Sequence, residues 1–350
     1  MLNGFRIVCV TPAGRRRYMR LLVPQILSED VVDEYQIWMN TEDQLDLLFL
    51  NELAQIPKVK LVPQPRGIVD GAFTICEFFA GCVDQGTIYI RFDDDIVWIE
   101  PGSIRALAET RIRDTESFLV SAAVVNNAVF TNMFQVLGLY DDSQYVHAHA
   151  FDEFGWKSGP FAESLHRHAL ELIGRNQLST MQFEPRMLAQ VRFSINCISW
   201  RGDMFSTFAG QVDREEEEFL SVVKPCRMGA VNKVDGRAIV CHFAFYTQRD
   251  YLDRTDLLAC YLEQVANAAW VRDEFRGAVE QAFVKAEELA SKAAERDQEG
   301  AAGSSILSRL IASLRFPYLR FRIEWMASAD YKRRLVRKFR NWPLIRAGDA

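Results

Sequence analysis

The feature that most constrains the fold is a regular alternation of short apolar runs and amphipathic stretches over the first hundred residues. Strand-like runs rich in β-branched and aromatic residues lie at 5–10, 35–40, 59–62 and 87–92. Segments with helical spacing of apolar residues lie between them, at 15–27, 43–55 and 69–83. This alternation predicts an α/β fold with a mainly parallel sheet and helices on both faces. In such sheets ligands bind beyond the carboxyl ends of the strands.

The rest of the chain continues the pattern less regularly. Further strands are predicted at 118–126, 191–200 and 238–246, and an irregular loop at 138–160. Further helices are predicted at 100–112, 163–173 and 213–224. We expect a main domain at 1–250, a helical segment at 251–290, a polar linker at 291–305 and a basic amphipathic tail at 306–350.

The balance of charged residues changes sign between residues 305 and 306, where the predicted tail begins. Residues 1–305 carry 30 Lys and Arg against 44 Asp and Glu, whereas residues 306–350 carry 11 against 3. An acidic body repels phosphate, so nucleic acid is not an expected partner. The tail interleaves its basic residues with aromatic ones, which is typical of segments that lie on anionic membranes. The alternatives are a helix packed on the acidic body or a contact in a homo-oligomer.

The N-terminus and the cysteines indicate a cytoplasmic protein, peripheral on the plasma membrane if the tail docks there. The start of the chain lacks the basic region, long apolar stretch and cleavage site of a signal peptide. No apolar run reaches the roughly 20 residues that a membrane-spanning helix needs. The seven cysteines are scattered, mostly among apolar residues, which favours reduced core thiols.

Three consecutive carboxylates, Asp93, Asp94 and Asp95, directly follow the strand-like run at 87–92. Adjacent carboxylates repel one another, and the apolar residues on both sides argue against the alternative, a solvated acidic turn. A divalent cation would remove the repulsion, and Mg²⁺ or Mn²⁺ prefers oxygen ligands. The triplet therefore predicts a metal site that Asp93 and Asp95 share.

The βαβ start, this Asp-x-Asp (DXD) motif at a strand end and the order of the later elements resemble a GT-A glycosyltransferase over roughly residues 5–250. The resemblance implies a Rossmann-like, mainly parallel sheet flanked by helices, here with a C-terminal helical basic extension. In that family the motif binds Mn²⁺ or Mg²⁺ and the diphosphate of a nucleotide-sugar. It thus implies that Asp93 and Asp95 bind the metal and that Asp93 and Asp94 contact the donor.

Two later motifs match the family pattern in the expected order. Gly202 and Asp203 resemble the glycine-containing loop that approaches the donor sugar, where the absence of a side chain lets the backbone come close. An ordinary strand-to-helix turn explains them equally. His242, in the run AIVCHFAF, resembles the late histidine that completes the metal shell; the alternative is a core histidine.

The acidic run 213–218 resembles the helix start that holds the catalytic carboxylate of inverting members of the family. Carboxylates are stabilised at a helix N-terminus by free N–H groups and the helix dipole. One of them could take the proton from an acceptor hydroxyl. We expect this base to be Glu217, with Glu216 as the second choice because adjacent glutamates leave the register ambiguous.

The loop after the first strand is expected, by the same resemblance, to contact the nucleotide. Thr11 and Pro12 would lie near the base or ribose. Arg15 would offer its planar guanidinium to the diphosphate, because such groups match phosphate oxygens. Arg66 and Asp70, before a predicted helix, are candidates for the base pocket, with ordinary loop positions as the alternative.

Together these features predict a metal-dependent glycosyltransferase, inverting, with a nucleotide-diphospho-sugar donor and a saccharide or lipid-linked acceptor, of the kind used in surface polysaccharide or glycolipid synthesis. No P-loop, dinucleotide-binding or hydrolase-elbow motif is present. Three alternatives remain. They are a nucleotidyltransferase of similar architecture, a non-catalytic nucleotide-sugar-binding protein, and a membrane-docked scaffold whose tail is the main functional element.

Overall fold

The computed structural model describes residues 1–302, and their side chains as far as residue 292. The chain divides into two compact units, Met1–Ala290 and Ser291–Ala350. Of the second unit only the end of helix α11 is described, and the predicted tail 306–350 lies outside the described residues. None of the described helices is both long and apolar enough to cross a membrane.

The first unit is built on one sheet with the strand order β3-β2-β1-β4-β8-β6-β9-β5, to which β7 adds by pairing with β9. Six of the described strands run in one direction: β1 (Arg6–Ala13), β2 (Glu34–Met39), β3 (Val59–Val62), β4 (Thr87–Phe92), β6 (Val120–Val125) and β9 (Asn232–His242). Three run against them: β5 (Ile96–Ile99), β7 (Arg186–Leu188) and β8 (Cys197–Arg201). The predicted α/β fold with a mainly parallel sheet is confirmed.

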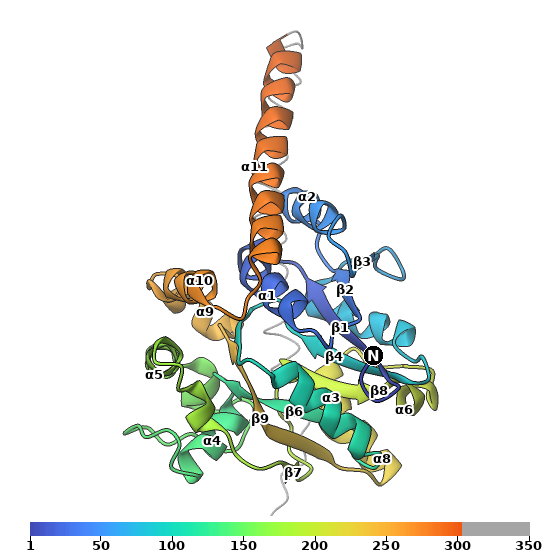
Figure 1. Ribbon diagram of the computed structural model, residues 1–350, viewed down its shortest axis with the longest axis vertical. Coiled ribbons are helices and arrows are strands. Elements are labelled where there is room, and N and C mark those ends of the chain that lie inside the picture. Colours follow the sequence, from blue (N-terminus) through green and yellow to red (C-terminus); the bar gives the residue numbers. More distant parts are fainter. Residues whose placement is uncertain (303–350) are drawn as a thin grey trace, which may run out of the picture. The chain divides into compact units, whose positions relative to one another are not determined.

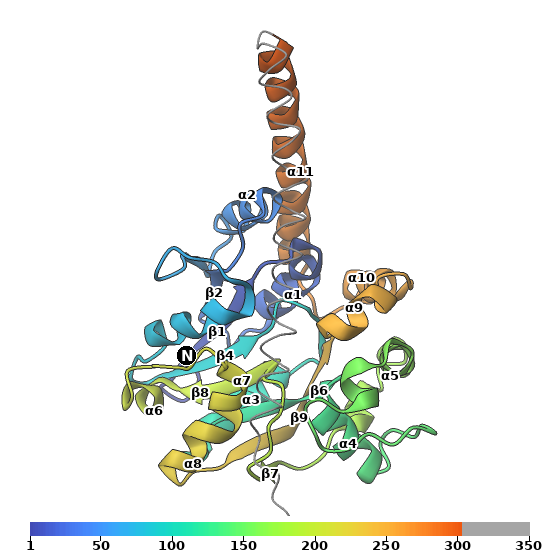
Figure 2. The ribbon, with the colours of Figure 1, turned by 180° about the vertical axis from the view of Figure 1, so that it is seen from behind.

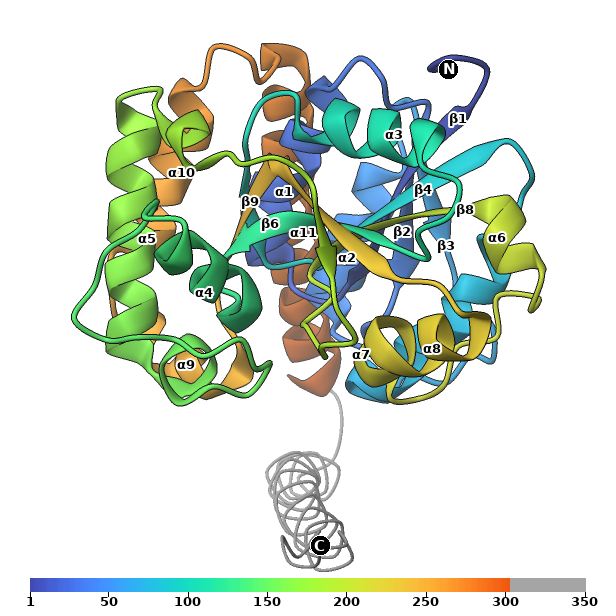
Figure 3. The same ribbon diagram turned by 90° about the horizontal axis from the view of Figure 1, so that it is seen from below.

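Helices flank this sheet (Figure 1, and from behind in Figure 2). Those before β6 are α1 (Arg16–Ser28), α2 (Gln44–Leu53), the 3₁₀ helix η1 (Gly71–Gly81) and α3 (Ser103–Arg113). Those between β6 and β9 are α4 (Ala128–Val136), the π-helix η2 (Glu153–Lys157), α5 (Gly159–Gly174), the 3₁₀ helix η3 (Leu178–Met181), α6 (Gly202–Ser206), α7 (Glu216–Glu218), the π-helix η4 (Phe219–Val223) and α8 (Lys224–Met228). Those after β9 are α9 (Tyr246–Leu252), α10 (Leu257–Asn267) and α11 (Asp273–Ala302). In Figure 3, α4 and α5 lie on one side of the sheet's centre, and α6 and α8 on the other.

The apolar sequence runs explain why the sheet is buried. The strands β4 and β6 are buried at every residue, as expected for strands covered on both faces. Aromatic side chains fill the space beside them; for example, Trp200 of β8 stacks on Tyr89 of β4 with ring centroids 5.6 Å apart. This packed core fixes the strand ends on which the polar side chains described below are mounted.

The structure differs from the sequence-based prediction in several elements, among them strands β5 and β7, which were not predicted. Residues 71–81 form a 3₁₀ helix where an α-helix was predicted, and α4 was not predicted at all. Helix α11 continues to Ala302 and so includes most of the stretch 291–305 that was predicted to be a linker. Alanine has the highest helix propensity, and alanines outnumber glycines in this stretch.

Candidate active site

Chain direction brings three segments to one edge of the sheet. Strand β4 ends at Phe92, so the acidic triplet follows at its carboxyl end. Strand β9 runs in the same direction and ends at His242. Strand β8 runs the opposite way and therefore begins at this edge, where the backbone N–H of Asp93 donates to the carbonyl of Asn196 over 2.8 Å.

At this edge Asp93, Asp95 and His242 form a candidate metal centre. One ligand atom from each lies within 4.8 Å of the others. The side chains of Asp95 and His242 are each only 3 % exposed. The two carboxylate oxygens suit Mn²⁺ or Mg²⁺, whereas an imidazole nitrogen is a ligand of transition metals, so the donor set favours Mn²⁺ among the two ions that the sequence predicts.

The imidazole of His242 is oriented by a backbone carbonyl. Its Nδ1 lies 3.2 Å from the carbonyl oxygen of Asn126, and its Nε2 lies 3.4 Å from Asp95 Oδ1. Asn126 adopts a left-handed backbone conformation with φ of 62°, which turns that carbonyl toward the ring. With Nδ1 donating to this carbonyl, Nε2 is left facing the carboxylates, the arrangement that metal-binding histidines use.

Two arginines neutralise the inner carboxylates. Arg15 donates through Nε to Asp94 Oδ1 over 3.0 Å, and its Nη1 lies 2.9 Å from Asp95 Oδ2. Arg249 of α9 approaches the same Asp95 oxygen to 3.5 Å, and the backbone N–H of Gly14 donates to Asp94 Oδ2 over 2.9 Å. Burial alone would raise the pKa of Asp95, but the charges of Arg15, His242 and Arg249 outweigh it and hold the pKa below its usual range.

A third arginine, Arg91, lies under the cluster and is only 3 % exposed. Its Nη2 donates to Asp93 Oδ1 over 2.8 Å and approaches Glu216 Oε1 to 2.9 Å. Burial raises the pKa of Glu216, and Arg91 opposes part of that rise. Within the described part of the chain, Glu216 Oε2 and the Nε and Nη1 atoms of Arg91 are buried without a hydrogen-bond partner. Such unsatisfied groups are uncommon in a purely structural network.

The two candidate bases differ in their surroundings. Glu216 points at Arg91 and Asp93 and is 11 % exposed. Glu217 accepts a 2.7 Å hydrogen bond from Nε of Arg192, whose Nη1 also reaches Glu218 over 3.2 Å. The carboxylate closest to the metal cluster is therefore that of Glu216, our second choice, whereas Glu217 is held by a cation farther out.

These groups line one cleft of about 320 Å³. The lining of this cleft includes Arg15, the start of η1 at Ala72 and Phe73, Tyr246 of α9, and Glu216 and Glu217 of α7. Among the predicted site residues, the cleft lining contains Arg15, Asp93, Asp95, His242, Glu216 and Glu217, while Asp94 lies directly behind it on Arg15.

Other predicted donor contacts lie elsewhere. Thr11 is fully buried in β1 and accepts a 3.0 Å hydrogen bond from the hydroxyl of Tyr35, and Pro12 pairs with Trp38 within the sheet. The side chain of Arg66 is 75 % exposed and faces Glu77 at 3.3 Å. Asp70 comes nearer, because it lies 3.9 Å from Arg214, which lines the cleft.

The prediction that Gly202 and Asp203 contact the donor does not fit the structure. Because β8 runs against β4, its residue Arg201 pairs with Ile88 at the beginning of β4, so both residues lie at the opposite edge of the sheet. A Cβ atom on Gly202 would meet the carbonyl oxygen of Asp84 at 2.1 Å. The glycine is therefore needed for packing, and Asp203 pairs with Arg201 at 2.6 Å.

Three polar residues of the site were not predicted. Arg91 had a signal, a cation inside the otherwise apolar run IYIRF, which implies buried anionic partners. Asn196 donates to Asp93 Oδ2 over 3.1 Å, but an asparagine at the start of a strand has no distinctive pattern. Arg249 reaches the site only because α9 folds back after β9.

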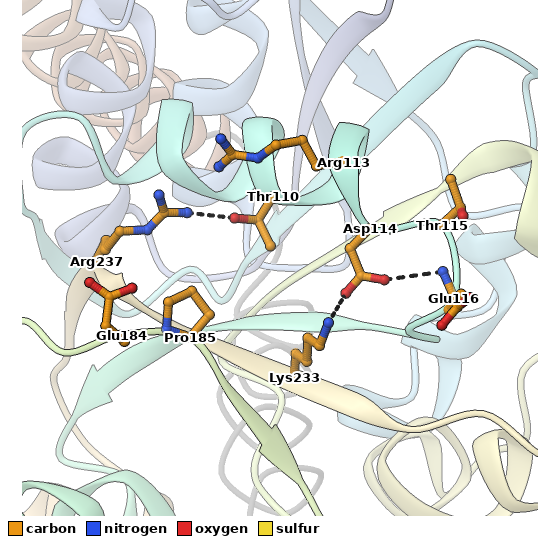
Figure 4. A pocket seen from close by; sticks show the side chains of 9 residues that line it. All are labelled: Thr110, Arg113, Asp114, Thr115, Glu116, Glu184, Pro185, Lys233 and Arg237. Carbon is orange, nitrogen blue, oxygen red and sulfur yellow. Dashed lines mark hydrogen bonds and ion pairs between the residues drawn. The ribbon is translucent and has the colours of Figure 1, made fainter.

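A second pocket, of about 500 Å³, lies away from this edge and is lined in part by α3, the residues just before β7 and the first half of β9 (Figure 4). Both cations of β9 in this pocket are paired: Lys233 donates to Asp114 over 2.6 Å, and Arg237 binds the fully buried Asp235 at 2.7 Å. We interpret these pairs as structural.

The fold and the site thus define an α/β protein with a mainly parallel sheet and a candidate metal centre at the end of its fourth strand. No protein-family model and no curated protein matches the sequence. Solved structures with a similar arrangement include a mycobacterial protein (14 % identity, 75 % of each chain covered, TM-score 0.42). Glucosyl-3-phosphoglycerate synthase from Mycobacterium tuberculosis, in complex with Mn²⁺, UDP and phosphoglyceric acid, matches at 14 % identity over 75 % of this chain and 79 % of that one (TM-score 0.40). CMP:2-keto-3-deoxy-manno-octonic acid synthetase, in complex with CTP, matches at 11 % identity over 74 % and 99 % of the chains (TM-score 0.41).

Proposed function

We propose that this protein is a metal-dependent glycosyltransferase that moves a sugar from a nucleotide-diphospho-sugar to an acceptor hydroxyl with inversion of configuration. The observation that carries the proposal is the convergence of two kinds of group on one cleft. The Asp93, Asp95 and His242 cluster suits a divalent ion, and the buried carboxylate of Glu216 lies next to it, one arginine away. Mn²⁺ or Mg²⁺ bound there would stabilise the charge that develops on a leaving diphosphate.

The arginines at the cleft supply the donor site in this proposal. Arg15 and Arg249 have side chains about one-third exposed, so both can turn from Asp95 toward a ligand. Guanidinium groups bind phosphate oxygens through two parallel hydrogen bonds, which fixes the orientation of the diphosphate. Asp94 then keeps Arg15 in position, through the bond to its Nε.

Glu216 is the proposed base. Its burial raises its pKa, and a base whose pKa lies closer to the working pH removes a proton more effectively. Its Oε1 is held by Arg91, which leaves Oε2 for an acceptor hydroxyl. Attack by that hydroxyl on the face opposite the diphosphate inverts the anomeric centre, and a product with retained configuration would refute this step.

A thermal-shift screen tests the proposal directly. UDP-, GDP- and dTDP-sugars should each be measured with and without Mn²⁺, because a ligand that binds only the folded state raises its apparent stability. We expect one donor class to stabilise the wild type only with the metal. Asp95→Asn should lose this shift and all sugar transfer, whereas Asp30→Asn, at an exposed carboxylate on Arg105, should keep both.

The product separates the glycosyltransferase from the nucleotidyltransferase. Sugar transfer releases a nucleoside diphosphate, whereas a nucleotidyltransferase would consume a nucleoside triphosphate and release pyrophosphate. Pyrophosphate release, or a metal-dependent shift with no turnover of any donor, would overturn the proposed reaction. Membrane docking through 306–350, a lipid-linked acceptor and homo-oligomer formation remain predictions, because the tail lies outside the described residues.

A further inference from the structure

A chain of aromatic side chains leads outward from the cleft. Tyr246, at the cleft wall, is 56 % exposed and meets Trp156 edge to face, with ring centroids 5.3 Å apart. Trp156 meets Phe151 in the same way at 5.1 Å, and Phe151 is 39 % exposed. These three rings come from α9, η2 and the loop before η2, so tertiary folding brings them together.

Arg192 connects this row of aromatic side chains back to the cleft. Arg192 lies over the ring of Phe151, 4.6 Å from its centroid, and donates to Glu217 over 2.7 Å. Glu217 itself lines the cleft. Tyr246, Trp156, Phe151, Arg192 and Glu217 therefore form a continuous belt, which we call the aromatic belt, that begins and ends at the cleft.

The loop that carries the belt is held in a fixed conformation. Asp152, which is 7 % exposed, accepts hydrogen bonds from the backbone N–H groups of Phe154 at 2.8 Å and Gly155 at 2.9 Å. A Cβ atom on Gly155 would lie 2.8 Å from Ala128, so the backbone packs directly on α4. The hydroxyl of Thr247 also donates to the carbonyl of Trp156. A site built this way binds without first ordering a loop.

We propose that the aromatic belt is the acceptor subsite and that it binds a neutral saccharide. This rests on the proposed function, in which Glu216 takes a proton from the acceptor. The acceptor must then reach α7, whose Glu217 belongs to the belt. The weakly positive C–H groups on one face of a sugar ring are attracted by the negative face of an aromatic ring. The Arg192–Glu217 pair offers both donors and acceptors to its hydroxyls.

The charges of the belt discriminate against other acceptors. Glu217 and Glu218 neutralise Arg192, so the belt has no surplus cation for a phosphate-bearing acceptor. A lipid chain would remove water from the same ion pair without offering it any hydrogen bond, which is costly. A polyol surface satisfies both the rings and the ion pair.

Saturation-transfer NMR tests the assignment without any nucleotide present. The probes are methyl hexopyranosides and hexose disaccharides, titrated into the wild type, Phe151→Ala and Phe151→Leu, with Val136→Ala as a control at a 66 % exposed side chain outside the belt. We expect ring C–H signals of at least one probe in the wild type and the control. Both Phe151 variants should raise the Kd of that probe about tenfold, the usual scale for an aromatic anchor. The Mn²⁺-dependent thermal shift caused by the nucleotide-sugar should stay unchanged in both.

The outcomes separate this inference from the proposed function. No binding of any saccharide by the wild type, or a Kd within twofold of wild type in a folded Phe151→Leu variant, overturns the aromatic belt as an acceptor site. Saccharide binding that depends on Phe151 supports the site even where no nucleotide-sugar binds, and that combination overturns glycosyl transfer instead. The leucine variant keeps an apolar side chain in place, so a folding failure of the alanine variant leaves the test intact.

Discussion

Replacing Arg91 with methionine should destabilise the protein severely, although the substitution is close in volume and apolar. Arg91 is 3 % exposed and bridges Asp93 at 2.8 Å and Glu216 at 2.9 Å. Without the guanidinium, two carboxylates would face each other in a site from which water is largely excluded. Removing one partner of a buried ion pair costs about 3–5 kcal/mol, because the charge left behind has neither water nor a counter-ion.

A double-mutant cycle isolates this effect from lost packing. Urea unfolding followed by circular dichroism gives the free energy of unfolding of the wild type, Arg91→Met, Glu216→Gln and the double variant. We expect the double variant to be more stable than Arg91→Met, because the glutamine removes one uncompensated charge, and the coupling energy should exceed about 1 kcal/mol. Arg167→Met, at the exposed pair with Glu163 on α5, should cost about 0.5 kcal/mol or less.

The reasoning fails if Arg91→Met costs no more than the Arg167→Met control. It also fails if the two site substitutions add to within about 0.5 kcal/mol, since independent sites behave in that way. Either result would mean that Glu216 and Asp93 are not held as charged partners of Arg91. The proposal that Arg91 presents Glu216 to an acceptor would then lose its basis.

Three further predictions concern other parts of the chain. Gly202→Ala should lower the free energy of unfolding by about 1–3 kcal/mol, because its Cβ would clash with the backbone of Asp84. The Mn²⁺-dependent thermal shift caused by a donor should stay unchanged. Loss of that shift in a folded variant would show that Gly202 contacts the donor after all. His166 is fully buried, and burial lowers its pKa to about 4, so between pH 6.5 and pH 4 the unfolded chain binds a proton that the folded protein does not. Urea unfolding should therefore show about 3 kcal/mol of stability that is present at pH 7 and lost by pH 4. His166→Gln should remove this pH dependence. Truncation before residue 306 should abolish flotation with anionic liposomes, and equal flotation of both forms would remove the membrane prediction.

The candidate metal cluster was predictable because its signal is local. A strand ends at Phe92 and three carboxylates follow it directly. The neighbouring sequence alone therefore places these carboxylates at the carboxyl end of a strand. His242 needed only the further expectation that its strand runs parallel to the first ones. The resemblance to a GT-A fold supplied that direction, and the structure brings the three side chains together.

The donor contact of Gly202 and Asp203 was predicted wrongly because the position of these residues depends on the direction of strand β8. Strand β8 has the same local signature as a parallel strand, a buried apolar run followed by glycine. Its antiparallel pairing with β4 reverses which end meets the triplet, so the residues that precede it, such as Asn196, reach the site and those that follow it do not. Nothing within the run itself encodes that direction.

The choice between Glu216 and Glu217 shows a second limit of local patterns. Both belong to one acidic run, and each can stand at the start of a helix. The decisive fact is that each faces a different arginine, Arg91 from β4 or Arg192 from the segment before β8. Successive residues on a helix point about 100° apart, so the two carboxylates cannot point in the same direction. The partner residues, far apart in the sequence, therefore assign the two glutamates their roles, the inner one beside the metal cluster and the outer one in the aromatic belt.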